Sequence, residues 1–305
     1  MSPACYKGRF APSPTGPLHF GSLVAAAGSY LDARASRGKW LVRMEDVDRL
    51  RCRPAYDKAI MLSLEAYGFQ WDGSVMRQSE RNEAYQAALE TLRKKNLAYP
   101  CACTRKEISD SDIAPDGAPI YPGTCAAGLP AGKTPRAWRI RVSGQTIRFV
   151  DLVQGRLSQD LSKTVGDFVL LRADGYFAYQ LAVVVDDASQ GITRIVRGAD
   201  LLDSTPRQIY LQHCLGVSFP EYAHLPVAVN AAGEKLSKQT RARALDDKNP
   251  VLALLAAFEF LGMPSLRGND TSLDDLWKEA VRHWSLDNVP PVRTISGGEI
   301  CQGGQ

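Results

Sequence analysis

The sequence lacks the long apolar run of a membrane protein. None of its apolar stretches approaches the roughly 20 residues that a membrane-spanning helix needs. Its first nine residues also lack the apolar core of a secretory signal peptide. No internal repeat and no disorder-like bias appear in a composition that is 45% hydrophobic and 23% charged. We therefore expect a soluble, cytoplasmic protein without a membrane partner, whose 305 residues form two or three structural units.

The chain also has little net charge, with 37 basic and 33 acidic residues and a formal charge of +4. Charge alone therefore does not indicate a nucleic acid partner. Residues 126–150 differ, because they contain no acidic residue and five basic ones: Lys133, Arg136, Arg139, Arg141 and Arg148. The stretch from Arg136 to Arg148 is a candidate for contacts with an RNA backbone, and the alternative is a solvated strand face.

Seven cysteines are an odd number, which does not favour a disulfide framework in a protein expected in the cytosol. Cys101 and Cys103 are followed after seventeen residues by Tyr121 and after three more by Cys125. Three thiolates and one further donor would complete a tetrahedral structural zinc site. The Cys-x-Cys spacing is tighter than the usual one and no histidine lies nearby, so buried thiols remain the alternative. The other cysteines are interpreted as ordinary residues: Cys5, Cys52, Cys214 and Cys301.

Two apolar, β-branched segments, residues 40–44 and 181–185, predict buried strands that end at acidic residues. Helical patterns accompany them, over residues 23–35, 56–67 and 80–95. This alternation predicts an α/β fold with a doubly wound, Rossmann-type parallel sheet. Ligands bind such sheets beyond the carboxyl ends of the strands, where Glu45 and Asp186 fall.

Proline, glycine and cysteine interrupt this rhythm after Tyr99. Alternation in residues 136–142 and 146–150, around a Ser-Gly turn, predicts strands with Trp138, Ile140 and Val142 on one face and Arg139 and Arg141 on the other. We interpret this region as an inserted, sheet-containing subdomain.

The remaining chain, from about residue 249, predicts a short helical C-terminal segment with helices over 251–261 and 273–284 and a frayed end at 300–305. The predicted units are the first half of the Rossmann-type domain at residues 1–98, the insertion at 99–165, the second half of the domain at 166–248 and the helical segment at 249–305.

The segment Arg9–Ser22 contains three prolines, two glycines and one histidine in fourteen residues. If a first strand ends near Ala11 and Gly21 begins a helix, the helix N-terminus offers backbone N–H groups and a positive dipole end to an anion. His19 could then donate to a phosphate. Taken alone, the segment favours a simple turn with a packed histidine.

A second polar loop, residues 235–239, follows the apolar segment 225–229, which we predict to be the last strand. Lys235 and Lys238 could clamp the oxygens of a polyphosphate and stabilise charge as it develops. Alone, a Lys-x-x-Lys pattern is usually a solvated pair of charges.

In this order the two loops resemble a known family. Residues 14–22 resemble the HIGH motif, and residues 235–239 the KMSKS motif, of class I aminoacyl-tRNA synthetases. Residues 184–208 are similar to the glutamyl and glutaminyl branch, and residues 9–16 resemble the glutamyl type. Only 66 residues follow Gln239, too few for the helical anticodon-binding region of a full glutamyl enzyme, so we expect no such domain. The chain resembles the truncated paralogues that attach glutamate to queuosine in the anticodon of tRNA(Asp).

The resemblance implies ATP-dependent formation of glutamyl-adenylate, with Mg²⁺ accompanying ATP, and transfer of glutamate to tRNA(Asp) carrying queuosine. It also implies one structural Zn²⁺ ion. The alternatives are a truncated enzyme that charges tRNA(Glu), another HIGH-type nucleotidyltransferase, and a non-catalytic tRNA-binding module. Sequence does not give the oligomeric state, and we expect a monomer.

A glutamate pocket needs a cation for the side-chain carboxylate and an anion for the ammonium group. By resemblance, Arg9 takes the first role and Glu45 the second; the alternatives are an ion pair for Glu45 and Arg197 and simple packing for Tyr179. The implied sites are catalytic His19, Lys235 and Lys238; ATP-binding His19, Gly21 and Lys238; glutamate-binding Arg9, Phe10, Ala11, Pro12, Ser13, Glu45, Tyr179 and Arg197; and zinc-binding Cys101, Cys103, Tyr121 and Cys125.

Overall fold

The structure is a computed structural model that describes residues 5–109, 111–114, 117, 119–144, 146–230, 233, 244–264 and 272–296. The predicted lysine loop at 235–239 and the predicted frayed end at 300–305 lie outside the described residues.

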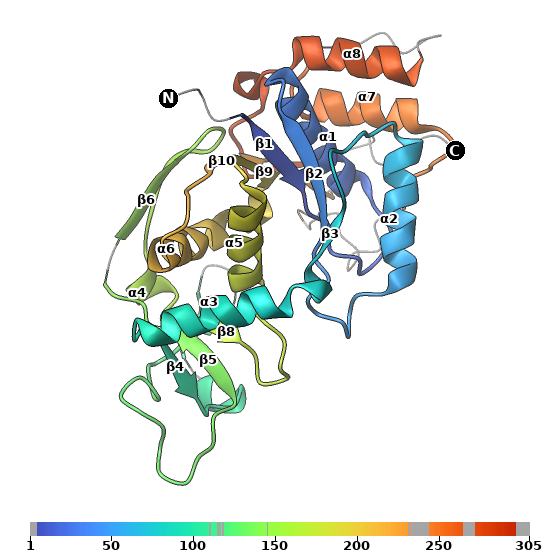
Figure 1. The fold of residues 1–305 in the computed structure, drawn as a ribbon. Helices are drawn as coiled ribbons and strands as arrows, with labels where there is room; N and C mark the ends of the chain where they lie inside the picture. The colour runs from blue at the N-terminus through green and yellow to red at the C-terminus, as the bar shows by residue number, and fades with distance from the viewer. Residues whose placement is uncertain are drawn as a thin grey trace.

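A largely parallel sheet forms the centre of the molecule, as the sequence predicts (Figure 1). One part contains β1 (Lys7–Phe10), β2 (Lys39–Met44) and β3 (Met76–Arg77), all parallel. A second part contains β9 (Arg194–Gly198), β10 (Glu221–Leu225) and β6 (Thr146–Asp151), also parallel, with β7 (Gly155–Asp160) antiparallel at the edge. The Thr193 amide donates to the Lys7 carbonyl at 2.9 Å, which joins β1 to the start of β9.

Helices pack around this sheet (Figure 1). They are α1 (Phe20–Ala35), α2 (Pro54–Ala66), α3 (Asn82–Lys94), α4 (Leu161–Thr164), α5 (Tyr179–Gln190), α6 (Thr205–Leu215), α7 (Pro250–Phe260) and α8 (Leu273–His283). Short 3₁₀ turns are η1 (Gln78–Glu80), η2 (Lys106–Ile108), η3 (Ala199–Ser204) and η4 (Leu286–Asn288). Figure 1 shows α7 and α8 beside α1 at one end, and the β4–β5 region beyond α3 at the other.

The predicted C-terminal helices are confirmed and pack through aromatic residues. Trp277 on α8 is 5% exposed and meets the rings of Tyr30, Phe69 and Phe258 at 4.8, 5.0 and 5.4 Å. Its indole N–H donates to the Tyr67 carbonyl at 2.9 Å. A buried aromatic cluster of this kind holds α7 and α8 against α1 and thereby supports the first strands of the sheet.

The prediction of a strand at residues 181–185 is wrong, because these residues lie in the helix α5. Leu181, Ala182, Val183 and Val184 are all buried, so the helix shows no polar face that periodicity could detect. Asp186 is therefore not at the end of a strand. Its carboxylate accepts hydrogen bonds from Gln78, Arg81 and Tyr85 at 2.7 to 2.9 Å, which ties α5 to the start of α3.

The two strands on either side of the Ser-Gly turn do not pair with each other. β5 (Ala137–Ile140) pairs with β4 (Ala98–Cys101) and β8 (Val169–Leu171), while β6 pairs with β7 and β10. β4, β5 and β8 therefore form an antiparallel sheet of their own, and β6 and β7 extend the central sheet. The division into four units stays a prediction.

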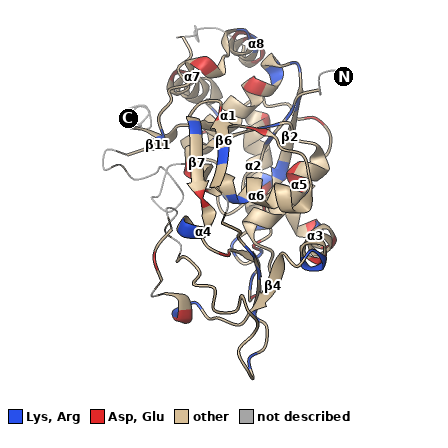
Figure 2. Cartoon of the chain, turned by 90° about the vertical axis from the view of Figure 1, so that its left-hand side faces the viewer, with Lys and Arg blue, Asp and Glu red and all other residues tan. Residues whose placement is uncertain are grey.

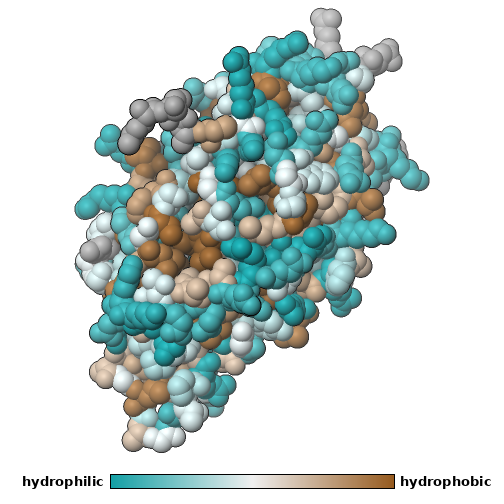
Figure 3. Space-filling view, viewed as in Figure 1, coloured by the Kyte–Doolittle hydropathy of each residue, from teal (hydrophilic) through white to brown (hydrophobic). Residues whose placement is uncertain are grey.

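Two further strands follow β10 where one last strand was predicted. β11 (Val227–Val229) pairs in parallel with β12 (Thr294–Ser296), and the two form a small sheet of their own. Among the described helices, none combines the length and apolar character that crossing a membrane requires. Figure 3 shows a largely hydrophilic face on which hydrophobic residues gather near the middle.

Candidate active site

A cavity of about 470 Å³ opens beyond the carboxyl ends of β1, β2, β9 and β10. This is where open α/β sheets place their ligands. Ten predicted site residues line it: Arg9, Phe10, Ala11, Pro12, Ser13, His19, Gly21, Glu45, Tyr179 and Arg197. The structure thus brings together every predicted glutamate-binding residue and the ATP-binding residues of the opening loop. Lys235 and Lys238 lie outside the described residues.

The N-terminus of α1 forms one wall of this cavity. His19 is the N-cap, and its Nδ1 accepts a hydrogen bond from the Ser22 amide at 3.3 Å. Accepting at Nδ1 places the proton of the neutral ring on Nε2. Gly21 and Ser22 line the cavity beside it, and the described first turn, Phe20–Leu23, contains no acidic residue. The helix dipole and its N–H groups therefore favour an anion at this wall.

Beneath the opposite wall lies a buried cluster of four charges, Arg9, Arg43, Glu45 and Asp187. Arg9 donates from Nε and Nη2 to the two oxygens of Asp187 at 2.9 and 3.3 Å, and Arg43 pairs with Asp187 at 2.8 Å and with Glu45 at 3.3 Å. Their side chains are 0 to 9% exposed. The two cations balance the two anions, which is how proteins tolerate charge at such depth.

The pKa values in this cluster follow from burial and pairing. Burial raises the pKa of Glu45 above its usual range even though Arg43 and Arg9 oppose the shift. Burial also acts to raise the pKa of Asp187, but Arg43 and Arg9 outweigh it and lower that pKa below its usual range. A new cation beside Glu45 would therefore compensate a negative charge that burial disfavours.

Arg197 has different partners from Arg9. At the end of β9 and 5% exposed, it donates from Nε to His224 at 3.0 Å, from Nη2 to Thr205 at 2.9 Å and from Nη1 to Tyr179 at 3.3 Å. Each of these partners is uncharged, since burial lowers the pKa of His224 to about 4. Three of the five guanidinium N–H groups are thus engaged, and the edge between Nη1 and Nη2 keeps one on each nitrogen. Such an edge binds a carboxylate through two parallel hydrogen bonds.

Several residues of the cavity escaped the sequence analysis. Thr15, Arg51, Asp200, Leu225, Pro226 and Val227 also line it. Asp187 was missed because the segment before it resembles a buried strand, and only its position on α5 turns the carboxylate toward Arg9. Asp200 follows Arg197 by three residues and lies in the segment similar to the glutamyl branch, so that similarity could have indicated it.

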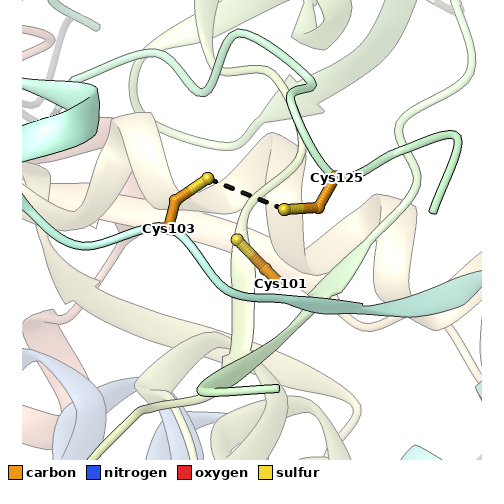
Figure 4. Close-up of side chains that lie close together, drawn as sticks. All are labelled: Cys101, Cys103 and Cys125. Atoms are coloured by element: carbon orange, nitrogen blue, oxygen red, sulfur yellow. Dashed lines mark hydrogen bonds between the residues drawn. The ribbon is translucent and has the colours of Figure 1, made fainter. Parts of the chain in front are cut away.

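The predicted metal ligands come together in a second place, beside β4. The sulfur atoms of Cys101, Cys103 and Cys125 all lie within 4.8 Å of one another, with Cys103 and Cys125 3.7 Å apart (Figure 4). The Tyr121 hydroxyl lies 3.4 Å from the Cys101 sulfur and 3.5 Å from the Cys103 sulfur.

These distances fit a tetrahedral metal ion. Zinc–sulfur bonds of about 2.3 Å at the tetrahedral angle put two sulfurs about 3.8 Å apart, and a zinc–oxygen bond of about 2.1 Å puts the oxygen about 3.6 Å from each sulfur. Cys101 and Cys125 are buried and Cys103 is half-buried. The cluster is therefore compatible with a metal site.

Arg139 belongs to this cluster, which corrects the expectation that it is open to an RNA backbone or to solvent. It is 7% exposed, donates to the Cys101 sulfur at 3.3 Å and lies 3.8 Å from the centre of the Tyr121 ring. Arg141 is half-buried, donates to the Ala126 carbonyl at 2.7 Å and stacks over Tyr99. Neither arginine therefore lies on a solvated strand face, whereas Arg148 on β6 is exposed. Figure 2 shows basic residues on β6 and β7.

Comparison with known proteins gives consistent results. Residues 6–271 match the family described as "tRNA synthetases class I (E and Q), catalytic domain". The chain is 60% identical to a glutamyl-Q tRNA(Asp) synthetase of Dechloromonas aromatica over 289 residues, which cover 93% of this chain and 96% of that protein. A protein of the same name from Aromatoleum aromaticum is 58% identical over 287 residues, covering 93% of this chain and 90% of its own.

A solved structure supports the fold. The glutamate-tRNA synthetase of Elizabethkingia anophelis superposes with a TM-score of 0.80 at 25% sequence identity. The superposition covers 98% of this chain and 69% of the larger protein.

Proposed function

The chain belongs to the glutamate and glutamine branch of the class I tRNA synthetases, and we propose that it activates L-glutamate with ATP and transfers it to queuosine in the anticodon of tRNA(Asp). The observation that carries this proposal is the convergence of ten predicted site residues on one cavity. The similarity to proteins named glutamyl-Q tRNA(Asp) synthetase over nearly their whole length supports the choice of nucleic acid substrate.

Glutamate binds, in this proposal, between cations and an anion of the cavity. Glu45 takes the ammonium group, because an added cation compensates a carboxylate whose pKa burial raises. Arg9 keeps its predicted role toward the side-chain carboxylate, and Arg197 adds the edge between Nη1 and Nη2. Ala11, Ser13 and Tyr179 complete the wall. A neutral amide in place of the carboxylate would leave the charge of Arg197 uncompensated, which favours glutamate over glutamine.

In the first step an oxygen of the glutamate α-carboxylate attacks the α-phosphorus of ATP, the new carboxyl–phosphate bond forms and pyrophosphate leaves. His19, Gly21 and the N-terminus of α1 stabilise the phosphate charge as it develops. Lys235 and Lys238 take the predicted clamping role from their loop. Mg²⁺ enters with ATP and neutralises part of the polyphosphate charge.

In the second step a queuosine hydroxyl attacks the activated carbonyl carbon, and AMP leaves. Holding the queuosine hydroxyl next to the glutamyl-adenylate accelerates this step, and we assign no protein base to it. The exposed Arg136 and Arg148 remain the candidates for RNA backbone contacts in the basic segment. The proposed reaction implies a cytoplasmic location, where tRNA is modified. All described residues that line the cavity belong to one chain, so we propose a monomer.

For the cysteine cluster we propose one structural zinc ion held by Cys101, Cys103, Cys125 and Tyr121. Four protein donors leave no open position for water, which is typical of a structural zinc site. Arg139 offsets part of the negative charge of the thiolates through its contact with Cys101.

Exchange of pyrophosphate into ATP, measured with and without glutamate, tests the first step. Lys238→Ala should leave glutamate binding nearly unchanged and depress exchange, because it removes charge stabilisation and not the amino-acid pocket. The exposed Lys248→Ala is the matched control. Unchanged exchange in Lys238→Ala would remove that residue from the mechanism. A non-catalytic tRNA-binding protein would show no glutamate-dependent exchange at all.

A further inference from the structure

Behind the cavity wall, a chain of buried polar groups runs from Arg197 to the end of β6. His224 on β10 is fully buried, and its Nε2 lies 3.0 Å from Arg197 Nε while its Nδ1 lies 2.6 Å from Asp151 Oδ2. Thr205 Oγ1 lies 3.1 Å from the same Nε2 and accepts from Arg197 Nη2. His224 does not line the cavity.

Asp151 has a fixed position in this chain of groups. It is 2% exposed, and its Oδ1 accepts hydrogen bonds from the amides of Val153, Gln154 and His224 at 2.8 to 3.1 Å. Burial acts to raise the pKa of Asp151, but its hydrogen bond with His224 and these amides outweigh burial and lower the pKa below its usual range. Its other oxygen, Oδ2, is thus a charged acceptor aimed at one nitrogen of the imidazole ring.

The tautomer of His224 follows from its two neighbours. A guanidinium N–H can only donate, so Nε2 accepts and carries no proton. The proton of the neutral ring is then on Nδ1 and is donated to Asp151. Burial lowers the pKa of His224 to about 4, so this neutral form holds at neutral pH.

We propose that His224 and Asp151 are positioning residues of the glutamate pocket, which hold the Nε edge of Arg197 so that its Nη1–Nη2 edge remains available to the side-chain carboxylate of the substrate. This inference rests on the function proposed above. His224 supplies a neutral acceptor where a carboxylate would compensate the charge of Arg197 and weaken its attraction for the ligand. Asp151 holds the ring in the only tautomer that can accept from Arg197.

The structure offers an internal comparison for this reasoning. Arg9 has the same edge, Nε and Nη2, engaged by the carboxylate of Asp187, so its charge is paired within the protein. Arg197 has that edge engaged by His224 and Thr205, which carry no charge. Compared with Arg9, Arg197 therefore has a charge that these contacts compensate less, and it attracts a bound carboxylate more strongly.

His224→Phe keeps a planar ring and removes both ring nitrogens. We expect its KM for glutamate to rise about tenfold, since a hydrogen bond to a charged group is lost, while kcat and the KM for ATP change less than about threefold. His224→Gln should restore most of the affinity, because the amide oxygen can accept from Arg197 and the amide nitrogen can donate to Asp151. His213→Phe is the matched control, since the His213 ring packs at a tilt against the exposed Phe219, with the ring centres 4.4 Å apart.

Asp151→Asn tests the tautomer. The three backbone amides hold the oxygen of the new side chain, so its NH2 group faces Nδ1 of His224. A donor at Nδ1 favours the ring proton on Nε2, where that proton opposes the N–H of Arg197. The KM for glutamate should therefore rise as in His224→Phe. The ¹⁵N shifts of the His224 ring give a readout without turnover. At pH 7 the wild-type protein should show a protonated Nδ1 and an unprotonated Nε2, and Asp151→Asn should lose this pattern.

The outcomes separate the two proposals. If wild-type protein shows no glutamate-dependent pyrophosphate exchange and no glutamate binding by calorimetry, the proposed function fails and this inference falls with it. If wild-type protein is active, an unchanged KM for glutamate in His224→Phe, or a protonated Nε2 in the wild type, overturns the inference alone. An equal rise in the KM for glutamate and the KM for ATP in His224→Phe, without recovery in His224→Gln, would indicate a purely structural role. This result would also overturn the inference.

Discussion

Asp187 and Asp57 form ion pairs of nearly the same geometry in very different surroundings. Arg9 donates two hydrogen bonds to the Asp187 carboxylate, at 2.9 and 3.3 Å, and Arg77 donates two to the Asp57 carboxylate, at 2.8 and 3.1 Å. The first pair is 3 to 5% exposed, and the second is 38% exposed at Arg77 and 16% at Asp57. Asp187 also pairs with Arg43, which is fully buried. The change to asparagine at each position therefore compares a buried carboxylate that two arginines hold with a more exposed one held by Arg77.

Asp187→Asn removes one negative charge from a cluster of two cations and two anions, and leaves a buried net charge of +1. Breaking a buried pair in this way costs about 3 to 5 kcal/mol of unfolding free energy, out of a typical total of about 5 to 15. The exposed pair is worth about 1 kcal/mol or less, so Asp57→Asn should change the stability little.

Urea unfolding of both variants, followed by circular dichroism at pH 7.5, measures the two losses. The difference between them should be at least about 2 kcal/mol. Equal losses, or a larger loss in Asp57→Asn, would refute the view that the cluster beneath the cavity is stabilised by charges that compensate one another out of contact with water.

Three further changes test other parts of the structure. Cys101→Ser should abolish bound zinc in elemental analysis, whereas Cys214→Ser should retain it, and full zinc content in the first variant would remove Cys101 from the ligand set. Trp277→Ala should lower the unfolding free energy by about 3 to 5 kcal/mol because it opens a cavity among buried rings, while the 74% exposed Leu252→Ala should change it by less than about 0.5 kcal/mol. The pKa of His224 is about 4 in the folded protein and about 6.5 in the unfolded chain, so the unfolded chain is protonated first as the pH falls. The unfolding free energy should therefore fall by about 3 kcal/mol between pH 6.5 and 4. The variant His224→Gln should lose this part of the pH dependence. A pH dependence that is the same in His224→Gln would contradict the assignment.

The amino-terminal half of the site could be predicted because its residues are close in sequence. The proline and glycine pattern between β1 and α1 locates a loop, and the acidic end of β2 locates Glu45. The family resemblance then joins these residues to Tyr179 and Arg197, and the cavity contains all of them. The family itself, predicted from the two loops and residues 184–208, is confirmed by the match to the catalytic-domain family.

The parts that could not be predicted depend on contacts between distant segments. Residues 181–184 of α5 are all buried, so this apolar run looks like a strand. The partners of Asp186 and Asp187 come from β1, β2, η1 and α3. Arg139 was expected on an outer face because alternation along a strand gives no information about which neighbour covers each face. Tyr121 and Cys101, which cover Arg139, precede it in the sequence by 18 and 38 residues.

The central claim is that the cavity serves glutamate transfer to a modified base of tRNA(Asp). The most direct measurement is attachment of radiolabelled glutamate to purified tRNA(Asp) with and without queuosine, beside tRNA(Glu), with ATP and Mg²⁺ present. The account predicts labelling of tRNA(Asp) only when it carries queuosine, and none of tRNA(Glu). Labelling of tRNA(Glu), with tRNA(Asp) unlabelled in both forms, would contradict it and make this chain a short enzyme that charges tRNA(Glu).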